Sequence, residues 1–132
     1  EMSSFVLPAD ELEYAVLSKV WELGSASVRD VSAGLGRREH LAYTTIAKVI
    51  DRLHGKGLIQ RERHGKAFLY VAKIPRERVE RARAEHVVRR LLGVAPHAAV
   101  ASLVGAVEAV DPELLKTLEQ AVAAHRRAKR GA

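Results

Sequence analysis

The 132-residue sequence contains no cysteine and no asparagine, and only 5% of its residues are aromatic. Without cysteine the chain cannot form disulfide bonds, cysteine-ligated zinc sites, iron–sulfur clusters or a thiol nucleophile. Its apolar runs are all shorter than the roughly 20 residues that a helix needs to cross a bilayer. The N-terminal residues also lack the basic start and apolar stretch of a signal peptide. We therefore expect a cytoplasmic protein without a membrane partner.

Motifs of catalysis are also missing. The run Gly55-Lys56-Gly57 lacks the spacing of a phosphate-binding loop, and no Gly-x-Ser-x-Gly elbow occurs. The six histidines include no pair at the spacing that places two metal ligands on one helix face. We therefore expect no enzymatic activity, no metal site and no cofactor.

Basic residues are abundant and unevenly distributed. The net charge is +6, and 48% of the residues are hydrophobic, as in a folded globular protein. Residues 1–36 carry a net charge of −4, residues 37–73 of +6 and residues 74–132 of +4. The compact basic segment indicates a surface that meets a polyanion, of which nucleic acid is the leading candidate. The solvated surface of an arginine-rich protein is the alternative that charge alone leaves open.

Two helices are predicted at the start of the chain. Apolar residues recur at helical spacing from Asp10 to Leu23, and Gly24 stands at the position of a C-terminal cap. The acidic residues Asp10, Glu11 and Glu13 suit the positive end of this helix better than they suit a catalytic pair. A second helix is predicted over residues 27–35, with Ser27 as its cap and Asp30, three residues further on, completing a shortened capping box. We expect Trp21 to lie in the core and glycines 34 and 36 to end the second helix.

A third helix, predicted over residues 42–56, has two distinct faces. One arc carries the apolar residues Ile46, Val49, Ile50 and Leu53. A neighbouring arc carries the short hydroxyl and long basic side chains Thr44, Thr45, Lys48 and Arg52. The first arc is predicted to be core, and the second would let the helix approach a ligand closely.

A basic hairpin is predicted next. Residues 58–63 and 67–71 read as short strands around His64-Gly65, and Arg61, Arg63 and Lys66 place positive charge on the strand and the turn. Two helices before a polar-faced helix, followed by such a hairpin, are typical of a winged helix-turn-helix. We thus expect a mainly α protein with a small β-hairpin, in which residues 1–74 form a winged-helix DNA-binding domain.

Residues 75–132 are predicted to form a helical dimerisation domain. The pattern predicts helices over 76–92 and 98–110 and a last helix that starts at Asp111-Pro112-Glu113. The middle helix is apolar over most of its surface, and a second copy of the chain could bury it. The alternative is that these helices pack back on residues 10–73 in a monomer. The interface residues predicted for a homodimer are Val79, Val87, Leu91, Val100, Leu103, Val104, Val107, Leu114 and Leu118.

The run from Leu41 to Ile59, LAYTTIAKVIDRLHGKGLI, resembles the penicillinase-repressor family of winged-helix regulators, the BlaI/MecI type with its copper-responsive CopY branch. The Tyr-Thr-Thr-Ile run, the Arg-Leu pair, the Lys-Gly-Leu run and the later segment 61–66 with Tyr70 carry this resemblance. The similarity covers about residues 7–72, and the helical tail matches by length and pattern only.

The resemblance implies a cytoplasmic, bacterial repressor that dimerises through its C-terminal helices and binds palindromic promoter operators in double-stranded DNA, such as those of antibiotic-resistance or stress genes. Carried over by position, Thr44, Thr45 and Lys48 would face bases in the major groove. Tyr43, Arg52 and Lys66 would hold phosphate or sugar. Arg61 and Arg63 join this DNA-binding set because they give the predicted wing its charge.

Two departures from the family pattern concern the signal that releases the repressor. The copper branch has a cysteine-rich C-terminus, so copper sensing is not expected here. The β-lactam branch is cut at an Asn-Phe bond, and the matching stretch 103–107 is Leu-Val-Gly-Ala-Val. Another protease, or a sensor of another kind, is left open as the route of derepression.

Two other functions stay open at this point. One is a protein-interaction module that uses the winged-helix scaffold, because a fold does not determine a function. The other is a nonspecific DNA-binding protein, which the charge alone would support. The adjacent Thr44 and Thr45 on a compact basic helix favour sequence readout over both.

Overall fold

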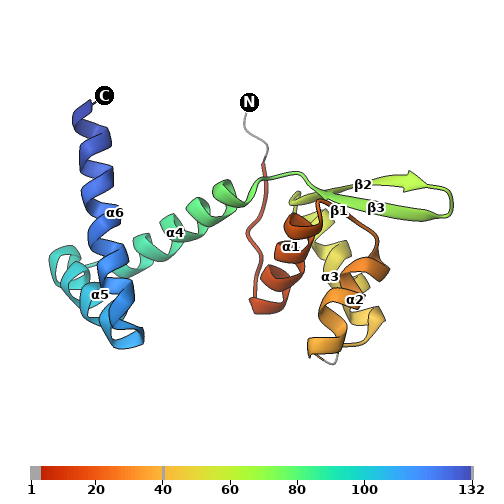
Figure 1. The fold of residues 1–132 in the computed structure, drawn as a ribbon, viewed down its shortest axis with the longest axis horizontal. Helices are drawn as coiled ribbons and strands as arrows, with labels where there is room; N and C mark the ends of the chain where they lie inside the picture. Colours follow the sequence, from red (N-terminus) through yellow and green to blue (C-terminus); the bar gives the residue numbers. More distant parts are fainter. Residues whose placement is uncertain (1–3, 40, 132) are drawn as a thin grey trace. The chain divides into compact units, whose positions relative to one another are not determined.

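The computed structural model describes residues 4–39 and 41–131, and this part of the chain divides after Ala84 into two units (Figure 1). The elements, in chain order, are α1 (Glu11–Leu23), β1 (Ser25–Ala26), α2 (Val28–Glu39), α3 (Tyr43–Gly55), β2 (Ile59–His64), β3 (Ala67–Ala72), α4 (Arg76–Leu92), α5 (Pro96–Val110) and α6 (Pro112–Gly131).

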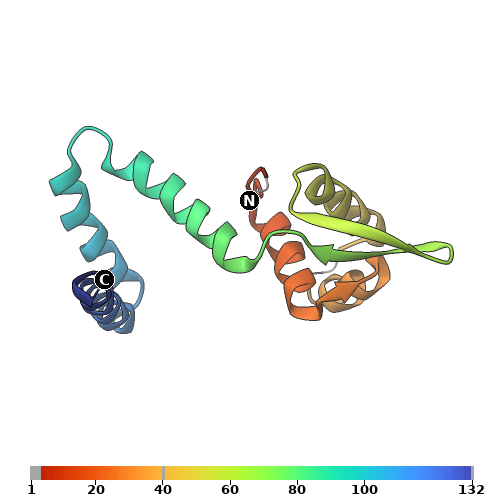
Figure 2. The same cartoon turned by 90° about the horizontal axis from the view of Figure 1, so that it is seen from above.

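The first unit is a winged helix. Helices α1, α2 and α3 pack against one another, and an antiparallel sheet with strand order β1-β3-β2 lies beside them. The hairpin of β2 and β3 extends well beyond the three helices, as both views show (Figures 1 and 2). The predicted fold class, mainly helical with a small hairpin, is confirmed.

The core of this unit draws on every one of its helices and on its sheet. The predicted inner face of α3 is fully buried, together with Leu58 and Ile74 after it in the chain. Burial of such aliphatic side chains supplies the main stabilisation of the unit. Trp21 is half-buried at the edge of the core, where its Nε1 donates a hydrogen bond to the carbonyl oxygen of Ile74 at 3.0 Å.

Polar side chains cap the starts of the first two helices. The carboxylate of Asp10 accepts a hydrogen bond from the backbone N–H of Glu13 at 2.9 Å and caps α1. The backbone N–H of Ser27 donates to the Asp30 carboxylate at 2.9 Å, and the N–H of Asp30 donates to the Ser27 hydroxyl at 3.1 Å. This reciprocal pair is the predicted capping box, and the hydrogen bonds lower the pKa of Asp30 below its ordinary value.

The predicted end of the second helix was wrong. Helix α2 continues through Gly34 to Glu39 instead of ending near residue 35. A Cβ atom at Gly34 would lie 3.1 Å from Cδ and Cε of Lys19 on α1. Gly34 therefore serves the close approach of the Lys19 side chain to α2 and does not terminate the helix.

Two further differences separate the structure from the sequence-based prediction. Strand β1 was not predicted, and its two residues pair with Val71 and Tyr70 of β3. Helix α5 begins at Pro96, two residues before the predicted start at residue 98, because proline is favoured in the first turn of a helix.

The division between the units falls after Ala84, not after residue 74. The first turns of α4 belong to the winged-helix unit because Val79 is fully buried in its core. Val79 is therefore not available as an interface residue, which corrects its assignment to the dimerisation set.

The second unit contains α5 and α6, which pack against each other. Neither helix buries a residue within the described chain. Large apolar side chains are exposed on both, among them Val100 and Leu103 on α5 and Leu114 and Val122 on α6. In the part of the chain that the structure describes, no single helix is long and apolar enough to cross a membrane; only α4 and α5 taken together pass that test, and they are bent by 120°.

Candidate nucleic-acid interface

Helix α3 separates a buried apolar face from an exposed face with hydroxyl and basic side chains. Its inner residues Ile46, Val49, Ile50 and Leu53 are 0% exposed, which fixes the rotation of the helix about its axis. The opposite face presents Thr44 and Lys48 to solvent, and Tyr43 is 53% exposed at the first turn. Thr45 is half-buried, so it lies at the edge of this exposed face.

The β2–β3 hairpin, which is the wing of this fold, follows α3 in the chain. It carries two arginines that stack on the ring of Phe68. Arg61 lies opposite Tyr70 and Arg63 opposite Phe68 in the β2–β3 register. The guanidinium carbon atoms lie 4.4 Å (Arg61) and 5.6 Å (Arg63) from the centroid of the Phe68 ring. A guanidinium stacked on a ring keeps its N–H edges available for phosphate oxygens. Both side chains are exposed, as their assignment to DNA binding requires.

The turn of the wing presents Lys66. Gly65 has a φ of +64°, a left-handed conformation that glycine adopts without strain, and it sets the tight turn between β2 and β3. Lys66, Tyr43 and Arg29 line one hollow of about 390 Å³ with Phe68 and Tyr70 of β3. The structure thus brings together the start of α3, the wing and the first turn of α2.

Sequence reasoning missed Arg29 and Asp51. Arg29 is exposed at the start of α2, and its only sequence signal was a lone positive charge two residues after the capping Ser27. Asp51 is exposed on α3 and lines a shallow hollow with Ala47, Lys48 and Arg52. A carboxylate on this face repels phosphate and can accept a hydrogen bond from the amino group of cytosine.

Arg52 occupies a more restrained position than the other predicted residues. Its Nε lies 3.2 Å from Oε2 of Glu13 on α1, and half of the surface of its side chain is exposed. Glu13 also accepts hydrogen bonds from Nζ of Lys56 at 2.5 Å and from the backbone N–H of Ala9 at 3.0 Å. Burial raises the pKa of the Glu13 carboxyl, but the hydrogen bonds from Lys56, Ala9 and Arg52 outweigh burial and hold it below the ordinary value.

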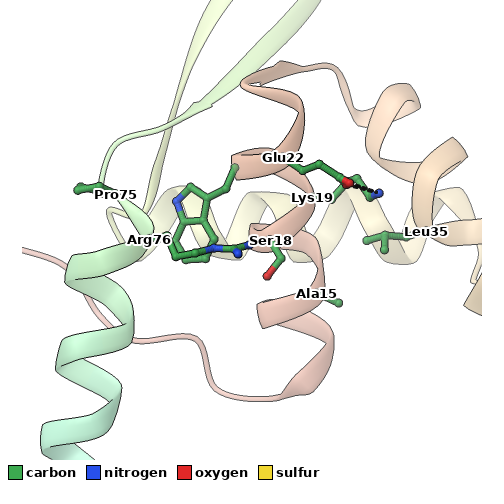
Figure 3. A pocket seen from close by; sticks show the side chains of 8 residues that line it. Ala15, Ser18, Lys19, Glu22, Leu35, Pro75 and Arg76 are labelled. Carbon is green, nitrogen blue, oxygen red and sulfur yellow. Dashed lines mark hydrogen bonds and ion pairs between the residues drawn. The ribbon is translucent and has the colours of Figure 1, made fainter. Parts of the chain in front are cut away.

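A second hollow of about 870 Å³ lies apart from this face, between α1, α2 and the start of α4 (Figure 3). Its charged groups already have partners. Lys19 pairs with Glu22 at 2.7 Å, and the guanidinium of Arg76 lies 5.0 Å from the centroid of the Trp21 ring. This hollow is part of the attachment of α4 to the winged helix and contributes nothing to the face of α3. Within the described ranges, no cluster of three potential metal ligands occurs.

The described geometry is therefore a winged helix whose third helix exposes hydroxyl and basic side chains and whose hairpin carries stacked arginines. That combination defines the class of winged helix-turn-helix DNA-binding proteins. A sequence profile of the penicillinase repressor family matches residues 10–124. The chain therefore belongs to the penicillinase repressor family, as the resemblance of residues 41–59 indicated.

Solved structures resemble about half of the chain. The solution structure of the DNA-binding domain of the repressor BlaI matches with a TM-score of 0.51 and 22% identity, over 56% of this chain and 90% of that one. The structure of the CopR repressor matches with a TM-score of 0.45 and 25% identity, over 54% of this chain and all of that one. The BlaI likeness supports the winged-helix fold.

A relative from Latilactobacillus sakei, described as an uncharacterized 16.5 kDa protein in the region 3′ of ptsI, is 35% identical over 63 residues. The match covers 48% of this chain and 43% of that relative, so the chain spans less than half of the relative's length.

Proposed function

We propose that the chain is a sequence-specific repressor that reads operator DNA with the exposed face of α3. The observation that carries this proposal is the separation of α3 into a fully buried apolar face and an exposed face with Thr44, Lys48 and Arg52. Short hydroxyl side chains allow the helix to enter the major groove closely, and long cations reach base edges and phosphates.

The residues divide into two roles in this proposal. Thr44, Thr45 and Lys48 contact base edges, with Thr45 at the margin of the contact because it is half-buried. Contacts to phosphate and sugar position the helix in the groove without reading sequence. The residues that we assign to those contacts are Tyr43, Arg52, Arg61, Arg63 and Lys66.

We further propose that two copies bind a palindromic operator as a homodimer formed through α4, α5 and α6. Two helices that bury no residue of their own leave a large apolar surface in water, which is unfavourable for a single copy. A two-fold dimer presents two copies of α3 to two half-sites. The interface side chains in this proposal are Val87, Leu91, Val100, Leu103, Val104, Val107, Leu114 and Leu118.

Binding to operator DNA and to mixed-sequence DNA tests the assignment of the α3 face. Thr45→Ala and Lys48→Ala should each weaken operator binding by about 1–3 kcal/mol and reduce the preference for operator. Lys116→Ala is the matched control, because it removes one positive charge from α6, outside the winged-helix unit. If both α3 variants bound operator as tightly as the control, the assignment would be wrong.

A further inference from the structure

Among the described residues, Glu13 is the charged side chain that is buried, with 2% of its surface exposed. It lies on α1, yet its carboxylate bonds Arg52 and Lys56, which are 39 and 43 residues further along the chain. The backbone N–H of Val6 also donates to the carbonyl oxygen of Lys56 at 2.9 Å. The N-terminal segment, α1 and the end of α3 therefore meet at one carboxylate.

We propose that Glu13 is a positioning residue for DNA binding, which holds the Arg52 guanidinium in the orientation that meets a phosphate of the operator. This inference rests on the proposed function, because it deepens the role given there to Arg52. Nothing in it requires Glu13 to touch DNA, and its burial prevents such contact.

The geometry explains why one carboxylate can do this. The bond to Glu13 uses Nε, one of the five N–H donors of a guanidinium, and half of the Arg52 side-chain surface stays exposed. A free arginine side chain loses much rotamer freedom when it binds a phosphate, whereas a side chain that is already held loses less. Paired donors on the outer edge of the guanidinium can then meet phosphate oxygens in a bidentate manner.

A purely electrostatic role for Glu13 predicts the opposite effect. Glu13 carries a negative charge close to a DNA-binding face, so neutralising it should strengthen binding to any duplex. If Glu13 positions Arg52, neutralising it should weaken binding to operator. The two interpretations therefore differ in the sign of the effect of one substitution.

A double-substitution cycle on the full chain measures this role. Affinity for operator and for mixed-sequence duplex is measured by fluorescence anisotropy for the wild type, Glu13→Gln, Arg52→Ala and the combined variant. Contacting residues show coupling of about 2- to 150-fold, and we expect Glu13→Gln to weaken operator binding about fivefold in the wild type. In the Arg52→Ala background the same change should have less than about a twofold effect.

Glu22→Gln serves as the control for charge, because it neutralises an exposed carboxylate on the same helix whose partner is Lys19. It should leave the preference for operator unchanged. The inference would be overturned if Glu13→Gln reduced operator affinity by the same factor in the wild-type and Arg52→Ala backgrounds. It would also be overturned if Glu13→Gln bound both duplexes more tightly.

Glu13→Gln also weakens bonds that hold α1 to the end of α3, so a second variant keeps the test decisive. Arg52→Lys keeps the charge on a half-exposed side chain, but a single ammonium cannot hold Glu13 and a phosphate with the fork of a guanidinium. The Arg52→Lys variant should lose operator affinity while its circular dichroism spectrum and melting curve match those of the wild type. Unchanged operator affinity would contradict the inference. If the wild type itself showed no preference for operator, the proposed function would fail, and that result is distinct from an absent coupling.

Discussion

Arg83 of α4 lies over the ring of Tyr14 of α1, with its guanidinium carbon 4.3 Å from the ring centroid. Two more arginines at the start of α4 stack in the same way, Arg76 on Trp21 at 5.0 Å and Arg78 on Phe5 at 5.5 Å. These contacts, with the buried Val79, attach the first turns of α4 to the winged helix.

The stacking of Arg83 should contribute measurably to stability. Arg83→Ala is expected to lower the free energy of unfolding by about 0.5–1 kcal/mol, the range of an exposed cation–π contact. Its ion pairs with Glu11 and Glu80, both 3.9 Å long, add little because they are exposed. Chemical denaturation checks this, with Arg89→Ala as the control in the solvent-exposed end of the same helix. Equal stability of the two variants would contradict a stabilising role for the stack.

Glu13 should make the winged helix sensitive to acid. Its pKa is lower in the folded state than the ordinary 4.5, so its ionised form stabilises the fold at neutral pH. This stabilisation is present above about pH 4.5 and is lost as the pH falls through the lowered pKa of the folded state.

Glu13→Gln should therefore lower the free energy of unfolding by about 1–3 kcal/mol at pH 7, the cost of disrupting a buried, hydrogen-bonded charge. The difference from wild type should shrink at a pH below the folded pKa, where the wild-type carboxyl is also neutral. Urea denaturation at pH 7 and at a pH below the folded pKa measures this difference in unfolding free energy. A difference that stayed constant with pH would refute a stabilising role for the ionised Glu13 carboxylate.

Lys66 at the tip of the wing should act on the DNA backbone. Lys66→Ala is expected to weaken binding to operator and to mixed-sequence DNA by the same factor and to reduce the salt slope by about 1. Titrations at several salt concentrations measure both quantities. Loss of affinity for operator alone would instead place Lys66 among the residues that read sequence.

The exposed apolar side chains of α5 should support a dimer. Leu103 is 37% exposed and Val104 is 39% exposed in the single chain. A charged residue at either position would leave an unpaired charge in the proposed interface, which is strongly unfavourable. Leu103→Glu should therefore shift sedimentation at micromolar concentration from a dimer toward the 14.5 kDa monomer. A wild-type chain that sediments as a monomer would rule out the dimer.

The sequence predicted what depends on local periodicity. The inner and outer faces of α3 follow from residues spaced at about 100° per residue, and the Ser27–Asp30 capping box follows from a spacing of three. Both signals lie within one helix, so no knowledge of the tertiary fold was needed to predict them.

Long-range contacts account for what the sequence did not reveal. Glu13 was assigned to the helix dipole, because its partners Arg52 and Lys56 lie three elements later in the chain. Val79 was assigned to an interface because an apolar stripe on a helix does not say which neighbour buries it. Strand β1 has two residues, too few for any alternating pattern.

Selection of genomic DNA fragments on the purified protein at about 150 mM salt is the most direct test of sequence-specific operator binding, because nonspecific contacts are already weakened at that concentration. If two copies of α3 read a palindromic operator, a few promoter fragments should be recovered that share an inverted repeat, with half-sites a whole number of helical turns apart. Recovery of fragments without a shared sequence, bound with an affinity that vanishes as salt rises, would contradict sequence-specific operator binding.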